Sequence, residues 1–250
     1  MTQEGQYIYA IIETDREVNF GPMGIGKEKG DVYTTVHNGI GAVISDSPVI
    51  QYPVTRANTM AHQSVMETVM KEYPMLPVRF GTVSEGLDPI RKKLLKERQG
   101  ELIETLTYMR GKIELGLKAI WKDMQPVFHE IVNQNKEIGR LRDRLLKRRG
   151  GAQRDQVRLG EMVKRALENW KEQKGNAILQ LLDGLWVEQK LNSHFGDQMI
   201  MNAAFLVEKE KEEAFDEAVE KISRKYAGRM SLKYVGPIPP CNFVEIVVQW

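Results

Sequence analysis

The sequence predicts an α+β protein built from two domains. Segments rich in β-branched and aromatic residues open the chain, recur in the middle and close it, with helical patterns between them. The length of 250 residues suits two small domains, and 42% hydrophobic with 28% charged residues is typical of a globular protein. We expect an N-terminal domain over residues 1–108 and a C-terminal domain over 109–250.

The N-terminal domain is expected to begin with three strands. The stretch "QYIYAIIET" reads as a buried strand, because β-branched and aromatic residues fill it. Two more strands lie in "DVYTTVHNGIGAVISDSP", joined at Asn38-Gly39, a pair that supplies the positive φ values of a tight hairpin turn.

A helix, a strand and a second helix follow, which gives the order β-β-β-α-β-α. Thr55 is the predicted N-cap of the first helix, which places His62 and Met66 on its apolar face. The stretch "PMLPVRFGTVS" predicts a strand. Asp88-Pro89 then reads as the N-cap and first residue of a helix that ends near Tyr108.

The C-terminal domain is expected to carry a long helical hairpin. It opens with the strand "GKIELGLKAIW", after which apolar residues repeat every seven positions from Met124 to Leu145. A second apolar stripe runs from Val163 to Leu185, and Gly150-Gly151 is the predicted break between two antiparallel helices. Gln134 and Asn135 interrupt the first stripe.

The last quarter of the chain returns to strands. "QMIMNAAFLVEK" predicts a strand, "EKEEAFDEAVEKISRKYAG" a helix that Gly228 stops, and "MSLKYVG" and "NFVEIVVQW" two strands around "PIPPC". This closing β-α-β-β order is typical of a ferredoxin-like α+β sandwich.

Composition excludes several classes of protein. The net charge of +2 is too small to indicate a nucleic-acid partner. A single cysteine, Cys241, cannot form an internal disulfide and favours a reducing compartment. No apolar run reaches the roughly 20 residues that span a bilayer, and no signal peptide is evident. We expect a soluble cytoplasmic protein.

A glycine-rich stretch, "GPMGIGKEKG", is only superficially like a phosphate-binding loop. Gly21, Gly26 and Lys27 have the spacing of that motif. Glu28 stands where the motif needs Ser or Thr, and a strand follows where it needs a helix. A loop without a nucleotide is the favoured interpretation.

His62 and Arg79 admit a chemical and a structural interpretation. In the first, they lie together in a cleft between the domains, as a general base beside an oxyanion-stabilising arginine of an enzyme, or as a small-molecule site. In the second, which we favour, His62 is a hydrogen-bonded core residue and Arg79 clamps its strand to the next helix or to the other domain. No catalytic group, metal site or cofactor site is predicted.

The predicted hairpin tip is strongly basic. Between residues 136 and 158 there are nine basic and three acidic residues, a local charge of +6. One interpretation is a solvated helix tip, and the other is docking to an acidic partner, as in a general chaperone for apolar helices. No aromatic residue is interleaved, which argues against single-stranded nucleic acid. The candidate docking residues are Arg140, Arg144, Lys147, Arg148, Arg149 and Arg154.

The segment "AHQSVMETVMKEYPMLPVRFGTVSEG" strongly resembles the signature of the gas vesicle protein F/L family (GvpF/GvpL). "YIYAII", "GAVIS", "GKIELGLKA" and "VGPIPPCNFVEI" match further parts of that family in order. The resemblance covers nearly the whole chain. It assigns a fold-defining motif to His62, Leu76, Pro77, Arg79, Phe80 and Gly81.

The resemblance implies two α+β domains, the second a modified ferredoxin-like fold, and a structural or assembly role in gas vesicle formation. The implied partners are the small hydrophobic shell protein and other gas vesicle accessory proteins, with no nucleic acid and no lipid membrane. The implied location is the vesicle shell within the cytoplasm, and neither a cofactor nor enzymatic activity is implied. We expect an apolar patch of the N-terminal domain to meet the shell protein. Ile238 and Cys241 stand where the family is expected to carry aromatic residues. If those aromatic residues form a contact surface, this protein has a weaker or different one, and if they only fill a core, the smaller substitutes change little.

Overall fold

The computed structural model describes residues 3–26, 29–147 and 153–250. Its backbone contacts divide the chain into two compact units. Unit 1 contains Met1–Glu114 and Pro237–Trp250, and unit 2 contains Leu115–Gly236. From the sequence we expect domains over residues 1–108 and 109–250, which places the whole C-terminal segment in the second domain. In the structure the chain from Pro237 onward belongs to unit 1.

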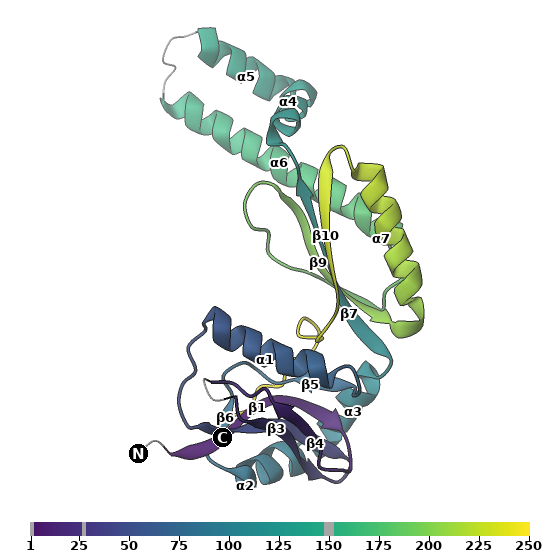
Figure 1. Cartoon of the computed structure of the whole chain (residues 1–250). Helices are drawn as coiled ribbons and strands as arrows, with labels where there is room; N and C mark the ends of the chain where they lie inside the picture. The colour runs from purple at the N-terminus through teal and green to yellow at the C-terminus, as the bar shows by residue number, and fades with distance from the viewer. Residues whose placement is uncertain (1–2, 27–28, 148–152) are drawn as a thin grey trace. The chain divides into compact units, whose positions relative to one another are not determined.

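Unit 1 is built on a six-stranded sheet with the order β2-β3-β4-β1-β5, and β6 also pairs with β1 (Figure 1). The central strand β1 is antiparallel to β4, β5 and β6, and the buried stretch predicted from "QYIYAIIET" lies in it. Asn38 and Gly39 have φ values of +43° and +87° in the turn between β3 and β4, as predicted. The strands are β1 (Glu4–Glu13), β2 (Asn19–Pro22), β3 (Asp31–His37), β4 (Ile40–Pro48), β5 (Met75–Pro77) and β6 (Val83–Ser84).

A β-bulge in β1 decides which of its side chains enter the main core cluster. The register with β4 shifts between Ile8 and Ala10. The extra residue, Tyr9, reverses the alternation of faces, so Tyr7 before the bulge shares a cluster with Ile12 after it, and Tyr9 belongs to the same cluster. The same cluster contains Val65, Met66 and Val69 of α1 (Arg56–Val69).

The helices of unit 1 follow the predicted order with one interruption. Thr55 caps α1, because its side chain accepts a hydrogen bond from the Asn58 amide at 3.2 Å. The single helix expected from Asp88-Pro89 to Tyr108 is broken. It consists of α2 (Leu87–Pro89), the π-helical segment η1 (Ile90–Lys96) and α3 (Gln99–Met109), and the N-cap position falls on Gly86.

The C-terminal segment does not form the strand expected over "NFVEIVVQW". It makes one parallel bridge, Val78 to Ile246, in which the Arg79 amide donates to the Ile246 carbonyl and the Ile246 amide donates to the Pro77 carbonyl. The neighbouring strand β5 is only three residues long, so the C-terminal segment has no longer strand with which to form a ladder. Trp250 at the end of the segment donates from Nε1 to the Val83 carbonyl at 2.7 Å.

Unit 2 is organised around a four-stranded sheet with the order β10-β7-β9-β8. The short, exposed strand β8 is not predicted by the sequence, whereas the other three are. Phe215, Val219 and Ile222 of α7 are buried on one helix face, as predicted. The elements are β7 (Lys112–Trp121), β8 (Glu188–Leu191), β9 (Met199–Glu208), η2 (Lys209–Lys211), α7 (Glu212–Tyr226) and β10 (Met230–Ile238).

The helical hairpin of unit 2 contains α4 (Met124–Gln134), α5 (Lys136–Lys147) and α6 (Gln153–Leu181). The predicted interruption separates α4 from α5, because Asn135 Oδ1 accepts from the amides of Glu137 and Ile138. The Gly150-Gly151 break falls outside the described residues. Figure 1 shows α5 and the first half of α6 projecting beyond the sheet. None of the helices among the described residues is long and apolar enough to cross a bilayer.

Candidate functional site

A cluster of aromatic side chains and a histidine lies in unit 1 between the sheet and α1. The ring centroids of Tyr7 and Tyr9 are 4.8 Å apart, and each lies 5.6 Å from the His62 ring. Phe80, on the segment after β5, approaches His62 edge-on at 5.6 Å. Such edge-to-face and stacked arrangements are favourable for aromatic pairs, so these rings fix one another.

A hydrogen-bond chain runs through this cluster. The Gly81 amide donates to the Tyr7 hydroxyl at 2.8 Å, and that hydroxyl lies 3.0 Å from Nδ1 of His62. The tautomer of His62 decides which of the two groups donates in this hydrogen bond. A second hydrogen bond joins His62 to the backbone of Val78.

Burial controls the protonation of this chain. Desolvation lowers the pKa of His62 to about 4, while the hydrogen bond to Val78 acts in the opposite direction. Desolvation likewise raises the pKa of Tyr7 above its ordinary value, against the opposing effect of the Gly81 amide. His62 is therefore neutral at physiological pH, and its hydrogen bonds join α1 to β1 and to Val78 in the segment after β5.

Arg79 lies apart from this chain of hydrogen bonds. Its side chain is about half exposed, and its Nε and a terminal nitrogen both lie 3.0 Å from Glu245 Oε2. Among the described residues no hydrogen bond joins Arg79 to His62. Arg79 thus contacts the returning C-terminal segment within unit 1. The sequence predicts a clamp from this strand to the next helix or to the other domain, and Glu245 lies in the second domain of the division expected from the sequence but in unit 1 of the structure.

Leu76, Pro77 and Gly81 of the "LPVRFG" motif lie in β5 and in the turn that follows it. Leu76 is fully buried, and Pro77 pairs with Ala10 of β1. Gly81 has a φ of +82°, a conformation in which glycine is strongly favoured, and this turn directs its amide to Tyr7.

A cavity of about 290 Å³ opens beside the aromatic cluster. From α1 it is lined by Thr59, His62, Gln63 and Met66, and Phe80 adds a further wall. The C-terminal segment supplies Ile238, Pro239, Cys241 and Asn242. Apolar surface predominates on these walls. Sequence segments separated by more than a hundred residues therefore meet in one hollow of unit 1.

Glu114 is the residue of this hollow that sequence reasoning missed. It lies in β7 and is fully buried, and it accepts hydrogen bonds from the backbone amide of Asn242, at 2.9 Å, and from the Asn242 side chain. A glutamate between Ile113 and Leu115 in a predicted strand is the signal that was available. Glu114 positions the segment that carries Ile238 and Cys241, the two residues expected to be aromatic in the family.

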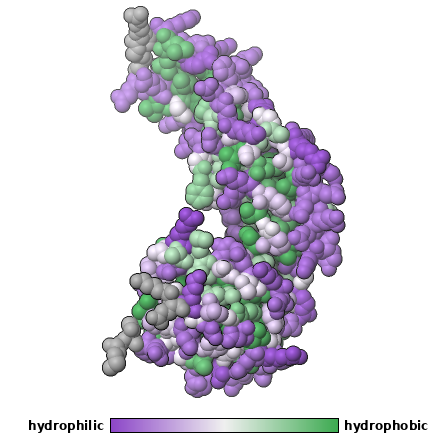
Figure 2. Space-filling model, in the orientation of Figure 1, coloured by the Kyte–Doolittle hydropathy of each residue, from purple (hydrophilic) through white to green (hydrophobic). Residues whose placement is uncertain are grey.

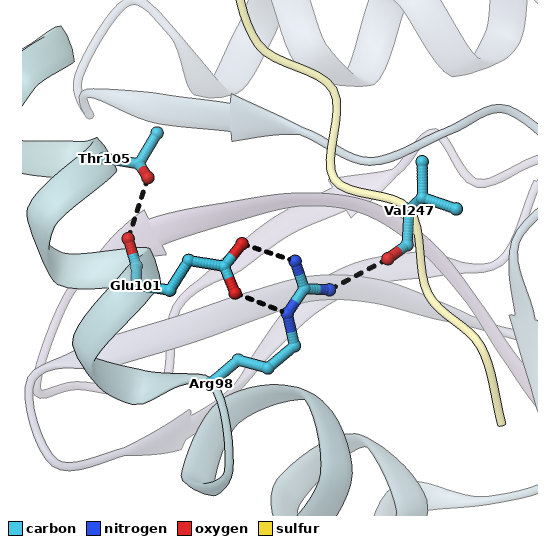
Figure 3. Close-up of polar contacts among 4 residues, drawn as sticks. All are labelled: Arg98, Glu101, Thr105 and Val247. Carbon is cyan, nitrogen blue, oxygen red and sulfur yellow. Dashed lines mark hydrogen bonds and ion pairs between the residues drawn. The ribbon is translucent and has the colours of Figure 1, made fainter.

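Arg98 is a second residue that the sequence did not single out. Its guanidinium forms a two-point contact with Glu101, at 3.0 and 2.7 Å, and donates to the Val247 carbonyl at 2.9 Å (Figure 3). Thr105 in turn donates to the Glu101 carbonyl. The hydrogen bond to Glu101 raises the pKa of Arg98 above its ordinary value. Arg98 and Arg79 together fasten the C-terminal segment to unit 1.

The two other candidate regions lie away from this hollow in the sequence. Gly21 and Pro22 of the glycine-rich stretch belong to β2 (Asn19–Pro22), and Lys27 and Glu28 fall outside the described residues. Of the basic tip, Arg140, Arg144, Lys147 and Arg154 are exposed, whereas Arg148 and Arg149 fall outside the described residues. Within the described part of the chain, no group of His, Cys, Asp and Glu side chains is placed to hold a metal ion.

Comparison with known families settles which family this architecture represents. A model of the gas vesicle synthesis protein GvpL/GvpF family matches residues 5–245. The chain belongs to the GvpL/GvpF family. The match includes every residue that lines the hollow of unit 1.

Relatives and solved structures agree with this membership over nearly the whole chain. Gas vesicle protein F of Streptomyces sp. (strain CB03234) is 28% identical over 96% of this chain and 99% of its own length. Gas vesicle protein F1 of Halobacterium salinarum is 26% identical over 97% and 94%. The crystal structure of GvpF from Anabaena sp. PCC7120 matches with a TM-score of 0.84 at 25% identity, covering 97% of this chain and 99% of that one.

GvpF from Microcystis aeruginosa has the same fold, with a TM-score of 0.79 at 22% identity over 97% of this chain and 99% of that chain. Membership in the GvpL/GvpF family gives this protein a role connected with gas vesicles. The mixed helix-and-sheet architecture predicted from the sequence is that of the GvpF structures.

Proposed function

We propose that this protein supports gas vesicle formation by binding the small hydrophobic shell protein of the vesicle, as a minor component or an assembly factor without enzymatic activity. Family membership supports the gas vesicle role. The apolar hollow of unit 1 is the observation that supports the binding step. The proposed location is the vesicle shell, and the proposed partners include other gas vesicle accessory proteins.

The size of the hollow favours a protein side chain over a cofactor or metabolite. Pockets for small molecules have volumes of roughly 300 to 1,000 Å³, and a cavity of about 290 Å³ lies at the bottom of that range. A hollow of this size suits one or two apolar side chains of a partner. Buried apolar anchors of that kind supply most of the binding energy in protein interfaces.

Two exposed apolar side chains occur on α1, which forms one wall of the hollow, and just before it. Met60, which follows Thr59 on α1, is 57% exposed, and Val54 before the helix is 82% exposed. Exposed apolar side chains favour contact with another apolar surface. The shell protein must keep a water-repelling face toward gas, and a partner with an apolar hollow can cover part of that face before or during polymerisation.

The order of strands in unit 2 supports the modified ferredoxin-like fold expected for the second domain. A ferredoxin-like unit has the sequence β-α-β-β-α-β. In unit 2 the strands β7, β8, β9 and β10 are separated by the helical hairpin and by α7 in that pattern. We propose that the helical hairpin occupies the place of the first helix.

The decisive experiment alters the hollow at its exposed rim. Cys241→Trp is designed to fill the hollow from a position where the side chain is exposed, and Cys241→Ser is the matched control. Capture of the shell protein by the full-length chain should be lost with Trp and kept with Ser, at unchanged melting temperatures. Equal capture by both variants would overturn the proposed site.

Flotation of gas vesicles from producing cells tests the role itself. Retention of the protein after a urea wash is expected of a built-in component, and loss from the vesicles with binding to soluble shell protein is expected of an assembly factor. Normal vesicles in cells that lack the protein, together with absence from both fractions, would contradict the gas vesicle function.

A further inference from the structure

Unit 2 carries two exposed surfaces of opposite charge. The first, here called the basic tip, is formed by the end of α5 and the beginning of α6. Arg140, Arg144, Lys147 and Arg154 are exposed there, and none of the four has an ion pair among the described residues. Among the described basic residues of this region, Arg142 and Arg158 are paired, with Asp143 and Glu137. Within its described part, the tip thus presents four cationic side chains that form no ion pair.

The basic tip is also partly apolar. Leu146 is 74% exposed and Val157 is 56% exposed, on the two helices that form the tip. Figure 2 shows hydrophobic surface among hydrophilic side chains at this end of the hairpin. A surface that combines unpaired cations with exposed apolar side chains fits a partner surface that combines carboxylates with apolar side chains.

The second surface, here called the acidic groove, runs between α7 and the edge strand β10. It has a volume of about 520 Å³ and is lined by four carboxylates, from Glu213, Asp216, Glu217 and Glu220, with no basic side chain among its lining residues. Val219, Leu232 and Tyr234 add apolar area to it. Figure 2 shows a hydrophilic surface over α7.

The carboxylates of the acidic groove are only partly neutralised. Glu217 and Glu220 pair with Lys221 and Arg224 one helical turn away, and exposed pairs of this kind are weak. Asp216 accepts a hydrogen bond from the Tyr234 hydroxyl. Glu213 has no ion pair within the described part of the chain. The groove therefore keeps a negative potential that a basic partner can use.

The two surfaces of one chain cannot meet each other. The basic tip lies at the N-terminal end of α6, whereas the buried residues Lys171, Gly175 and Ile178 anchor the C-terminal half of the helix. At 1.5 Å per residue, about 27 Å of continuous helix separates Gln153 from Lys171. α7 packs near that anchored half, so the helix holds the tip away from the groove of its own chain.

We propose that the basic tip of one copy of this protein docks into the acidic groove of a second copy. The complementary charge of the two surfaces identifies the occupant as another copy of this chain. Since the two surfaces differ, the contact is heterologous, and each copy keeps a free tip or a free groove for the next. The product is a head-to-tail chain or a closed ring. The inference does not depend on shell-protein binding, which is assigned to unit 1.

A charge-swap experiment on the full-length protein tests this arrangement. Arg144→Glu with Arg154→Glu reverses the tip, and Glu213→Lys with Glu217→Lys reverses the groove. Lys93→Glu with Lys96→Glu, on η1 of unit 1, changes the net charge as the tip variant does. Glu97→Lys with Glu104→Lys does the same for the groove variant. All eight side chains are exposed.

Sedimentation velocity over a concentration series in low salt should show self-association of the unaltered protein and of both control variants. Each reversed variant alone should remain monomeric, and an equimolar mixture of the two should associate again, because opposite charges then face each other at both contacts. Higher salt should weaken association by about tenfold or more.

Three results would overturn the proposal. They are a monomer at every concentration, association that both reversed variants retain, and a mixture of the reversed variants that stays monomeric. Binding of the unaltered protein to vesicles of anionic lipid, lost in the tip variant without any self-association, would assign the tip to a charged membrane surface and would likewise overturn it.

Discussion

The Tyr7 hydroxyl lies 3.0 Å from Nδ1 of His62 on α1, and it also accepts a hydrogen bond from the Gly81 amide. Among the described residues, it is the only side-chain atom of β1 that is hydrogen-bonded both to α1 and to the Gly81 turn. Tyr7 is fully buried, and His62 is 5% exposed. The pair thus joins β1, α1 and the turn after β5 in the interior of unit 1. Its geometry has direct consequences for stability and pH dependence.

Acid should destabilise the protein through His62. Its pKa falls from 6.5 to about 4 on folding, so the unfolded chain binds more protons between these values. The contribution is fully present above pH 6.5 and is lost as the pH falls toward 4, a total of about 3 kcal/mol, of which about 2 is lost by pH 5. Urea unfolding of the unaltered protein and of His62→Gln at pH 7 and pH 5 measures it.

The difference between those two proteins isolates His62 from the other titrating groups. His129→Gln, at an exposed position on α4, is the control and should unfold with the pH dependence of the unaltered protein. Equal pH dependence in His62→Gln and the unaltered protein would show that His62 does not titrate as its burial requires.

Removal of the Tyr7 hydroxyl should weaken unit 1. Tyr7→Phe leaves the Gly81 amide and Nδ1 of His62 without their partner, and each unsatisfied buried group costs about 1 to 3 kcal/mol. Tyr73→Phe, whose ring packs against Phe20, should change the free energy of unfolding little. Similar stabilities of the two variants in urea would contradict the role of the Tyr7 hydroxyl.

Gly81→Ala should destabilise the protein through the backbone alone. Gly81 has a φ of +82°, and no atom lies within 4 Å of a Cβ placed there. The left-handed conformation costs a non-glycine residue about 1 to 2 kcal/mol. Gly86→Ala is the matched control, because Gly86 is extended at φ 167° with equal space. We expect a lower melting temperature for Gly81→Ala and an unchanged one for Gly86→Ala. Equal changes of melting temperature in the two variants would show that the backbone at position 81 is not strained by a side chain.

Glu114→Gln should loosen the C-terminal segment. A glutamine cannot accept from both Asn242 groups as a carboxylate does, so a buried donor loses its partner at a cost of about 1 to 3 kcal/mol. Hydrogen exchange of the amides from Asn242 to Ile246 should accelerate in the variant. Glu97→Gln, at an exposed position in the turn between η1 and α3, should leave this exchange unchanged.

Local sequence signals predicted much of the framework. The hairpin at Asn38-Gly39, the Thr55 cap and the interruption at Asn135 all follow from the conformations or hydrogen bonds that those residues favour. The apolar face of α7 follows from helical periodicity. The resemblance in "LPVRFGT" identified the family, because that motif is long and specific.

The candidate site could be predicted only in part. His62 and Phe80 came from the motif, whereas Glu114 and Arg98 were missed because their partners, Asn242 and Val247, lie more than a hundred residues further along the chain. The break at η1 and the edge strand β8 were missed because neither has a distinctive local pattern.

By itself the sequence determined the buried strand at the N-terminus, the helix faces and the turns, since periodicity and preferred φ values act between neighbouring residues. Only the tertiary structure decided that the segment from Pro237 onward returns to unit 1. It also decided that the bulge after Ile8 places Tyr7 and Ile12 in one cluster. Those outcomes depend on contacts between distant segments, where burial and shared hydrogen bonds outweigh local preference.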